Sequence, residues 1–124
     1  MADFLSDEWL DELEAAAERA SVPASIRLTV QQVVDDGGVE RAYALRIEDG
    51  RVTVVRGRVP DADVSFTQDR ATAAAIAQGL ESAQAAFLAG RLRIGGQLHR
   101  FGEAAMALAE VGDVFAELRA STRF

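Results

Sequence analysis

The sequence contains no cysteine, no lysine and a single histidine among its 124 residues. Without cysteine the chain has no disulfide bond, no thiol nucleophile and no thiolate metal ligand. One histidine leaves a histidine-based metal site or a Ser-His-Asp triad short of parts. The 13 basic residues, all arginine, are outnumbered by 20 acidic ones, which gives a net charge of −7. Because this acidic excess repels phosphate backbones, we expect no nucleic-acid partner.

Long apolar runs and targeting signals are also lacking. The least charged stretch, residues 71–90, is rich in alanine and glutamine and is interrupted by Glu81, so it predicts no membrane span. The first residues are acidic where a secretory signal requires basic ones, and the C-terminus carries no peroxisomal tripeptide. With 49% hydrophobic residues the composition is globular. We therefore expect a single cytoplasmic domain over residues 1–124 that does not insert stably into membranes.

The first half of the chain predicts one helix followed by three strands. Ser6 precedes two acidic residues, as is typical of the start of a helix. Alternating apolar and polar residues then predict strands at residues 26–34, 43–47 and 51–56. Asp49-Gly50 is a strong signal for a two-residue hairpin between the second and third of these strands. The pattern indicates a three-stranded antiparallel meander.

The second half predicts two short strands and several helices. A fourth strand at residues 64–67 leads into a helix that is capped by Thr67 or Asp69 and ends at Gly79, and Ser82 caps a second helix that ends at Gly90. A fifth, peripheral strand contains Leu92 and Ile94. A long helix then follows Gly96 and is interrupted at Gly112, with a predicted core-facing stripe of Leu98, Phe101, Ala105 and Leu108. The order of elements is that of an α+β domain with helices over one sheet face.

The helices predicted after Thr67 have unusually small side chains. Residues 71–77 hold five alanines around one isoleucine, and residues 83–89 hold four alanines near Phe87 and Leu88. Alanine is the best helix former, and small residues permit close packing of a helix on a sheet. The same small side chains would also leave an apolar void large enough for a hydrophobic ligand. The spacing of the residues leaves both interpretations open.

No assembled catalytic or metal site is evident. His99 lies beside the apolar stripe of the last helix, and no nucleophile or orienting carboxylate is evident near it. The acidic pairs at residues 35–36 and 61–63 lack the ligand number and spacing of a calcium loop, so they indicate turns. The segment from Gly90 to Gly96 lacks the lysine and hydroxyl residue of a phosphate-binding loop. We expect no metal and no cofactor.

Three segments carry a resemblance to a known family. Residues 61–69 (DADVSFTQD), residues 86–96 (AFLAGRLRIGG) and the hairpin at residues 45–54 occur in the order and spacing of the sterol carrier protein-2 family. The chain resembles that family from about Phe4 to Leu118. The resemblance implies a five-stranded, mixed but mostly antiparallel sheet that is covered by helices on one face and encloses an apolar cavity.

The resemblance also implies a function. Members of the family bind sterols, fatty acids, fatty acyl-CoA or phospholipids in an apolar tunnel between sheet and helices, without metal or catalytic residues. Members often carry aspartate where this sequence has Gln97, a departure that does not bear on ligand choice. The arginine-only, alanine-rich composition suggests a GC-rich bacterial source, for which an acyl-chain lipid is a better expected ligand than a sterol.

The leading hypothesis is thus a non-enzymatic lipid binder or carrier. The expected wall of the tunnel is apolar and consists of Phe66, Ile76, Phe87, Leu88, Leu92, Ile94, Leu98, Phe101 and Phe115. A polar head group would meet one of three nearby arginines, Arg91, Arg93 or Arg100. The alternative is a structural or interaction module with a filled core, acting as a homodimer. An enzyme using His99 and Glu103 ranks lowest.

Overall fold

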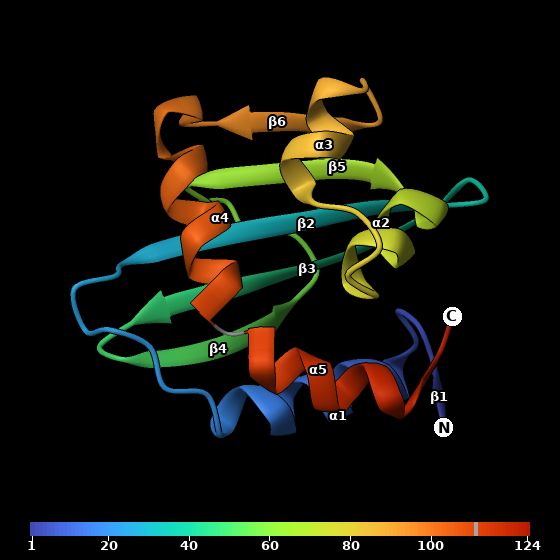
Figure 1. Ribbon diagram of the computed structural model, residues 1–124, viewed down its shortest axis with the longest axis horizontal. Coiled ribbons are helices and arrows are strands. Elements are labelled where there is room, and N and C mark those ends of the chain that lie inside the picture. Colours follow the sequence, from blue (N-terminus) through green and yellow to red (C-terminus); the bar gives the residue numbers. More distant parts are fainter. Residues whose placement is uncertain (111) are drawn as a thin grey trace.

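A computed structural model describes the backbone of residues 1–110 and 112–124 and the side chains of residues 1–107 and 116–124. Figure 1 shows a sheet with helices in front of it and along one edge. In chain order the elements are β1 (Ala2–Asp3), α1 (Asp7–Glu18), β2 (Leu28–Asp36), β3 (Val39–Glu48), β4 (Arg51–Arg56), β5 (Val64–Asp69), α2 (Arg70–Ala77), α3 (Ala83–Leu88), β6 (Leu92–Gly96), the 3₁₀ turn η1 (Leu98–Arg100), α4 (Phe101–Glu110), α5 (Gly112–Ala120) and β7 (Thr122–Arg123).

Helix α1 begins where its sequence predicts. The Ser6 side chain accepts a hydrogen bond from the Trp9 backbone N–H at 3.1 Å and so satisfies one of the unpaired donors of the first turn. The apolar face of the helix is buried, and Leu13 is completely inaccessible to solvent. This face packs against β4 and against α5, which lies beside α1 along the same edge of the sheet (Figure 1).

The predicted antiparallel meander is confirmed as β2, β3 and β4. Asp49 and Gly50 join β3 to β4 and both have positive φ, at 54° and 77°. That conformation gives a two-residue hairpin turn whose twist matches the strands, and glycine adopts it without a Cβ penalty. In register, Val30 lies opposite Leu45 and Leu45 opposite Val54, so three apolar residues face the helices together.

The connection from β4 to β5 makes the sheet mixed. It passes behind the sheet in Figure 1 and lays β5 parallel to β2. The buried Gln31 side chain holds this connection, because its amide donates to the Gly57 carbonyl at 3.1 Å and its oxygen accepts from the Val59 N–H at 2.7 Å. Strand β6 then pairs antiparallel with β5 at the sheet edge, giving the order β4-β3-β2-β5-β6. The peripheral position predicted for the fifth strand is confirmed.

Two predicted helix caps are confirmed in front of the sheet. Of the two candidates for α2, Asp69 is the cap, accepting from the Thr72 N–H at 2.8 Å, whereas Thr67 lies within β5. The Ser82 hydroxyl accepts from the Ala85 N–H at 3.0 Å and starts α3. Figure 1 shows α2, α3 and α4 in front of the same face of the sheet, as expected from the sequence.

The predicted continuous helix after Gly96 is wrong at its start. A 3₁₀ turn precedes α4, and its three residues per turn shift the phase of the side chains relative to an α-helical pattern. As a result Ala104 and Ala107 are completely buried, while Leu98 is 60% exposed. Phe101 still packs against the core, and Leu108, the fourth residue of the predicted stripe, has a side chain outside the described residues.

Pairing of the two ends of the chain was not predicted. Strands β1 and β7 lie parallel, with Ala2 opposite Thr122. The Trp9 indole N–H donates to the Thr122 hydroxyl at 3.2 Å, and that hydroxyl donates to the Leu118 carbonyl at 2.6 Å. Each strand has two residues, which is too short for an alternating pattern to be recognised. No described helix combines the length and apolar character that crossing a bilayer requires.

A close approach of backbones at Gly96 leads to a first prediction. A Cβ on Gly96 would lie 2.6 Å from the Asp63 carbonyl oxygen, whereas a Cβ on Gly90 would meet nothing within 4 Å. Both glycines have φ of 80°. We expect Gly90→Ala to cost about 1 kcal/mol of unfolding free energy from backbone strain, and Gly96→Ala to cost at least about 1 kcal/mol more because of the added clash. Urea unfolding of both variants measures this, and equal losses would contradict it.

Candidate functional site

A pocket of about 430 Å³ lies between the sheet and the helices, and we call it the helix–sheet pocket. Its floor is formed by the sheet, with Val34, Leu45 and Phe66 from three different strands. These floor residues are buried, whereas Ser82 and Gln84 of its lining are exposed. The pocket therefore faces solvent beside α3 and is closed on its sheet side.

Small side chains keep this volume open. Ala73 and Ala77 of α2, Ala83 of α3 and Ala105 of α4 line the pocket, so none of these helices fills the space above the sheet. Other alanines serve close packing instead, and Ala86 is completely buried in the core. Alanines of these helices therefore occur both in the lining of the pocket and in the packed core.

Aromatic rings form one wall of the pocket. Phe4 meets the Trp9 ring edge-on at a centroid distance of 5.0 Å, and Trp9 meets Tyr43 at 5.7 Å. The Phe124 ring packs against Phe4 in a tilted arrangement, with a centroid distance of 5.1 Å, and is 37% exposed. All four rings line the pocket. Because Phe4 and Phe124 stand at opposite ends of the chain, the pairing of β1 with β7 is what brings their two rings together.

Several polar groups interrupt the apolar lining. The Gln68 amide donates to the Gln32 side-chain oxygen at 2.8 Å, which satisfies part of the hydrogen-bonding capacity of the buried Gln68 side chain. Burial raises the pKa of the Tyr43 phenol, so this side chain stays neutral. Glu81 is bound by both terminal nitrogens of Arg91. The Arg119 Nε donates to the Ala77 carbonyl at 2.5 Å and joins α5 to α2.

The structure brings only some of the predicted wall residues to the pocket. Phe66, Ile76 and Leu92 line it. Ile94 and Phe101 pack against the core beside it, and the Phe101 ring meets Phe66 edge-on at 5.8 Å.

Three other predicted wall residues lie largely at the surface. Phe87, Leu88 and Leu98 are 42%, 84% and 60% exposed. Leu88 and Leu98 lie at the end of α3 and in the 3₁₀ turn, where their side chains face solvent. Phe115 has a side chain outside the described residues.

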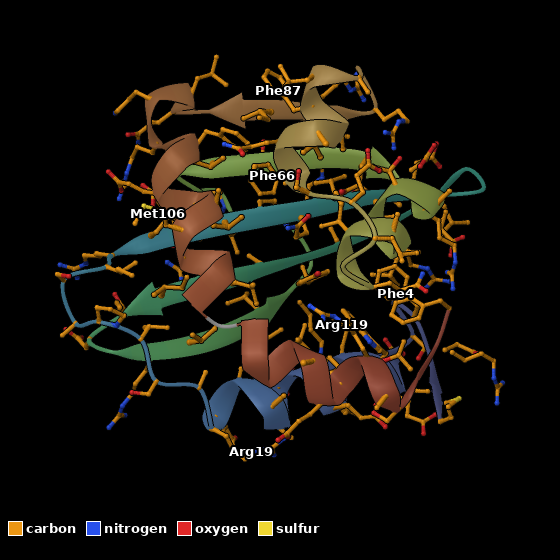
Figure 2. The ribbon with its side chains drawn as sticks, in the orientation of Figure 1. Phe4, Arg19, Phe66, Phe87, Met106 and Arg119 are labelled. Atoms are coloured by element: carbon orange, nitrogen blue, oxygen red, sulfur yellow. The ribbon has the colours of Figure 1, made fainter. Side chains whose placement is uncertain are left out.

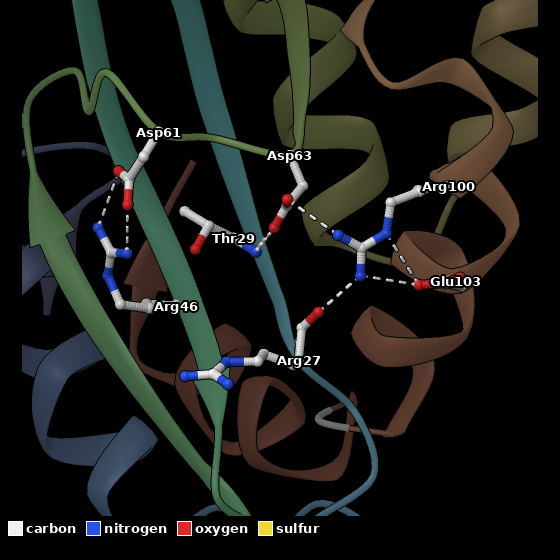
Figure 3. Close-up of polar contacts among 7 residues, drawn as sticks. All are labelled: Arg27, Thr29, Arg46, Asp61, Asp63, Arg100 and Glu103. Atoms are coloured by element: carbon white, nitrogen blue, oxygen red, sulfur yellow. Dashed lines mark hydrogen bonds and ion pairs between the residues drawn. The ribbon is translucent and has the colours of Figure 1, made fainter.

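Arg100, predicted to meet a head group, is engaged in a structural network (Figure 3). Its guanidinium pairs with Asp63 at 2.9 Å and donates to the Arg27 carbonyl at 2.6 Å and to Glu103 at 3.0 Å. Asp63 in turn accepts from the Thr29 N–H at 2.8 Å. Arg100 therefore ties the start of α4 to β2 and to the start of β5.

The other two predicted head-group residues differ in their surroundings. Arg91 is held by Glu81, whereas Arg93 is exposed on β6. Glu103, the predicted partner of His99 in the enzyme hypothesis, is bound by Arg100, and both His99 and Glu103 are exposed. Within the described residues, no group of three or more acidic, histidine or cysteine side chains is arranged to hold a metal ion.

Sequence reasoning missed several pocket residues. Trp9 and Tyr43 lie in the helix and the second strand that the sequence predicts, but nothing in the periodicity of these elements indicates a void beside the two side chains. Phe124, Thr122 and Arg119 come from the C-terminal segment, whose approach to the N-terminus depends on long-range pairing. No local signal in the sequence identifies these three residues.

The model of the SCP-2 sterol transfer family matches residues 5–110. The chain belongs to the SCP-2 sterol transfer family. The family's activity is the carriage of sterols and related lipids. No curated protein sequence matches the chain significantly.

Solved structures of the SCP-2 family share this fold. The palmitated sterol carrier protein 2-like 2 of Aedes aegypti is 14% identical, with a TM-score of 0.64 and coverage of 81% of this chain and 90% of that one. A conserved hypothetical protein of Thermus thermophilus, described as possibly a sterol carrier protein, is 20% identical, with a TM-score of 0.64 and coverage of 95% and 91%. At these identities the likeness shows the fold alone.

An enzyme also contains a region of similar shape. A double mutant of a sec-alkyl sulfatase is 21% identical over 79% of this chain, with a TM-score of 0.61, but the match covers only 15% of the sulfatase. The fold of this chain therefore also occurs as a small part of a much larger protein.

The Arg100 network leads to a second prediction. Because Arg100→Ala leaves Asp63 without its cation in a half-buried position, we expect a loss of about 1–3 kcal/mol in unfolding free energy. Arg93→Ala removes an exposed arginine of the neighbouring strand and should change stability by less than about 0.5 kcal/mol. Urea denaturation of the two variants compares them. A similarly small loss of unfolding free energy in both variants would show that the Arg100 network contributes little to stability.

The Glu81–Arg91 pair leads to a third prediction. Hydrogen bonding to Arg91 lowers the pKa of Glu81 below its usual value, so the pair stabilises the protein above the unfolded pKa and loses this effect as pH falls through the folded pKa. Carboxyl NMR titration should show Glu81 protonating at lower pH than an ordinary glutamate. Arg91→Gln should raise the pKa of Glu81. An unchanged titration midpoint of Glu81 would contradict the assignment of Arg91 as the cause of its lowered pKa.

Proposed function

We propose that this chain binds an acyl-chain lipid in the helix–sheet pocket and carries it without chemical conversion. The observation that carries the proposal is a pocket of about 430 Å³ whose floor and walls are mainly apolar side chains. Ligand sites have volumes of about 300–1,000 Å³ and are lined in this way. The Aedes aegypti relative, which shares the fold, was solved in a palmitated form.

Apolar burial supplies the binding energy. Each methylene that moves from water into an apolar pocket contributes about 0.8 kcal/mol, so a long acyl chain gains ample affinity even after ordering costs. Phe66, Ile76 and Leu92 are the predicted wall residues that we propose to contact the chain, together with Trp9 and Leu45. Phe101 acts through its edge contact with Phe66.

The same arrangement gives less support to the other hypotheses. An interaction module with a filled core would not need small residues around an open volume such as that beside Ala77 and Ala105. Self-association remains a prediction, for which the exposed Leu88 and Met106 offer apolar surface. We propose a carrier rather than an enzyme, in line with the family, and a single lipid-binding domain over residues 1–124.

Native mass spectrometry of the freshly purified protein, followed by organic extraction, tests the proposed function. A mass increment that matches a fatty acid, acyl-CoA or phospholipid supports it and names the ligand class. A dominant dimer without any lipid, combined with no binding of micromolar fatty acid or acyl-CoA, would contradict it and favour the interaction module.

A fourth prediction concerns blocking of the pocket. Ala105→Phe places a ring in the pocket from α4, and we expect fatty-acid affinity to fall at least about tenfold, a loss of about 1.4 kcal/mol. Ala85→Phe makes the same change on the exposed side of α3, outside the lining, and should leave affinity within about twofold. Trp9, the single tryptophan, lines the pocket, so its fluorescence measures binding. Equal fatty-acid affinities of the two variants would show that the ligand binds outside the helix–sheet pocket.

A further inference from the structure

Arg119 is the one cationic residue in the described lining of the helix–sheet pocket. It extends from α5, is half-buried, and is held in place because its Nε donates to the Ala77 carbonyl at 2.5 Å. Figure 2 shows it between α5 and α2, on the side of the sheet that the helices cover. This bond fixes one edge of the guanidinium and leaves its two terminal nitrogens to be satisfied by other groups.

Arg119 also differs from nearly all other arginines in its charge balance. Within the part of the chain that the structure describes, every arginine except Arg51, Arg93 and Arg119 forms an ion pair with a carboxylate. Arg51 and Arg93 are exposed, so water satisfies their charges. Arg119 combines partial burial with the absence of a described carboxylate partner, so no described carboxylate competes for its terminal nitrogens.

Glu81 is the one acidic residue of the described lining, and it does not compete with a ligand for Arg119. Glu81 is held by both terminal nitrogens of Arg91, which lies outside the lining, and no described ion pair joins Glu81 to Arg119. Arg91 thereby neutralises Glu81. The local charge at the pocket wall is set by Arg119, although the whole chain has a net charge of −7.

We propose that Arg119 binds the anionic head group of a single-chain amphiphile, a carboxylate in the first instance, while the acyl chain lies along Phe66 and Leu92. The inference rests on the proposed function and deepens it, since it assigns the polar end of the ligand. A planar guanidinium donates two parallel hydrogen bonds to a carboxylate, which an uncharged alcohol cannot accept in the same way. The three arginines expected from the sequence to meet the head group are not needed for this role.

Dodecanoate, dodecanol and dodecyl phosphate have the same chain and differ in the head group, so their affinities isolate its contribution. They are titrated into the wild-type protein, Arg119→Gln, Arg119→Lys and the exposed control Arg93→Gln, with Trp9 fluorescence as the readout. We expect the wild type and Arg93→Gln to bind dodecanoate at least about tenfold more tightly than dodecanol. Arg119→Gln should bind dodecanoate and dodecanol equally, and Arg119→Lys should keep part of the preference for dodecanoate.

The outcomes separate this inference from the proposed function. Equal binding of dodecanoate and dodecanol by the wild type overturns the role of Arg119 but leaves a lipid pocket. Binding of neither ligand overturns both. If Arg119→Gln does not fold, Arg119→Lys still decides the matter, and an undiminished preference for dodecanoate in that variant overturns the role of the Arg119 guanidinium. Dodecyl phosphate binding more tightly than dodecanoate supports an anion site and assigns it to phosphate.

Discussion

The position of α4 over the sheet depends on Asp63. Its carboxylate accepts from the Thr29 N–H and pairs with Arg100, and its backbone oxygen accepts from the Gln97 N–H at 2.8 Å. These contacts join the start of β5, the start of β2 and the turn that follows β6. Gly96 permits the approach, because any Cβ there would collide with the same backbone. The start of α4 is thereby fixed, and with it the wall of the helix–sheet pocket that Ala105 supplies.

The pocket is the space that the alanine-rich helices leave when they are held in this way. Buried Ala104 and Ala107 let α4 approach the core closely, whereas Ala77 and Ala105 leave room above Phe66. Because close-packed interiors seldom hold large voids, a volume of about 430 Å³ beside mainly apolar side chains is unusual within a domain of this size. The same small side chain thus serves packing at one position and ligand space at another.

Arginines at the surface and the arginine in the pocket differ in the groups that hold them. Most arginines are paired with the abundant carboxylates, which removes them as general anion sites and keeps the exterior acidic. Arg91 and Arg100, expected from the sequence to meet a head group, are part of this pairing. Arg119 is placed differently because a backbone carbonyl, and not a carboxylate, holds it.

Local signals in the sequence determined the helix caps at Ser6 and Ser82 and the hairpin at Asp49-Gly50, because each depends on residues within three positions. For α2 they left Thr67 and Asp69 as candidates, and the structure selects Asp69. They also determined the alternating strands and hence the α+β class. The sequence pattern did not predict which residues of α4 face the core, because a 3₁₀ turn before the helix shifts the direction of its side chains. The exposure of Leu88 and Leu98 depends on where α3 and the 3₁₀ turn lie over the sheet.

Only the tertiary structure decided that β1 pairs with β7, which brings Phe4, Phe124 and Arg119 to one pocket. Contacts between residues more than a hundred positions apart leave no periodic trace in the sequence, since they arise from the packing of the whole chain.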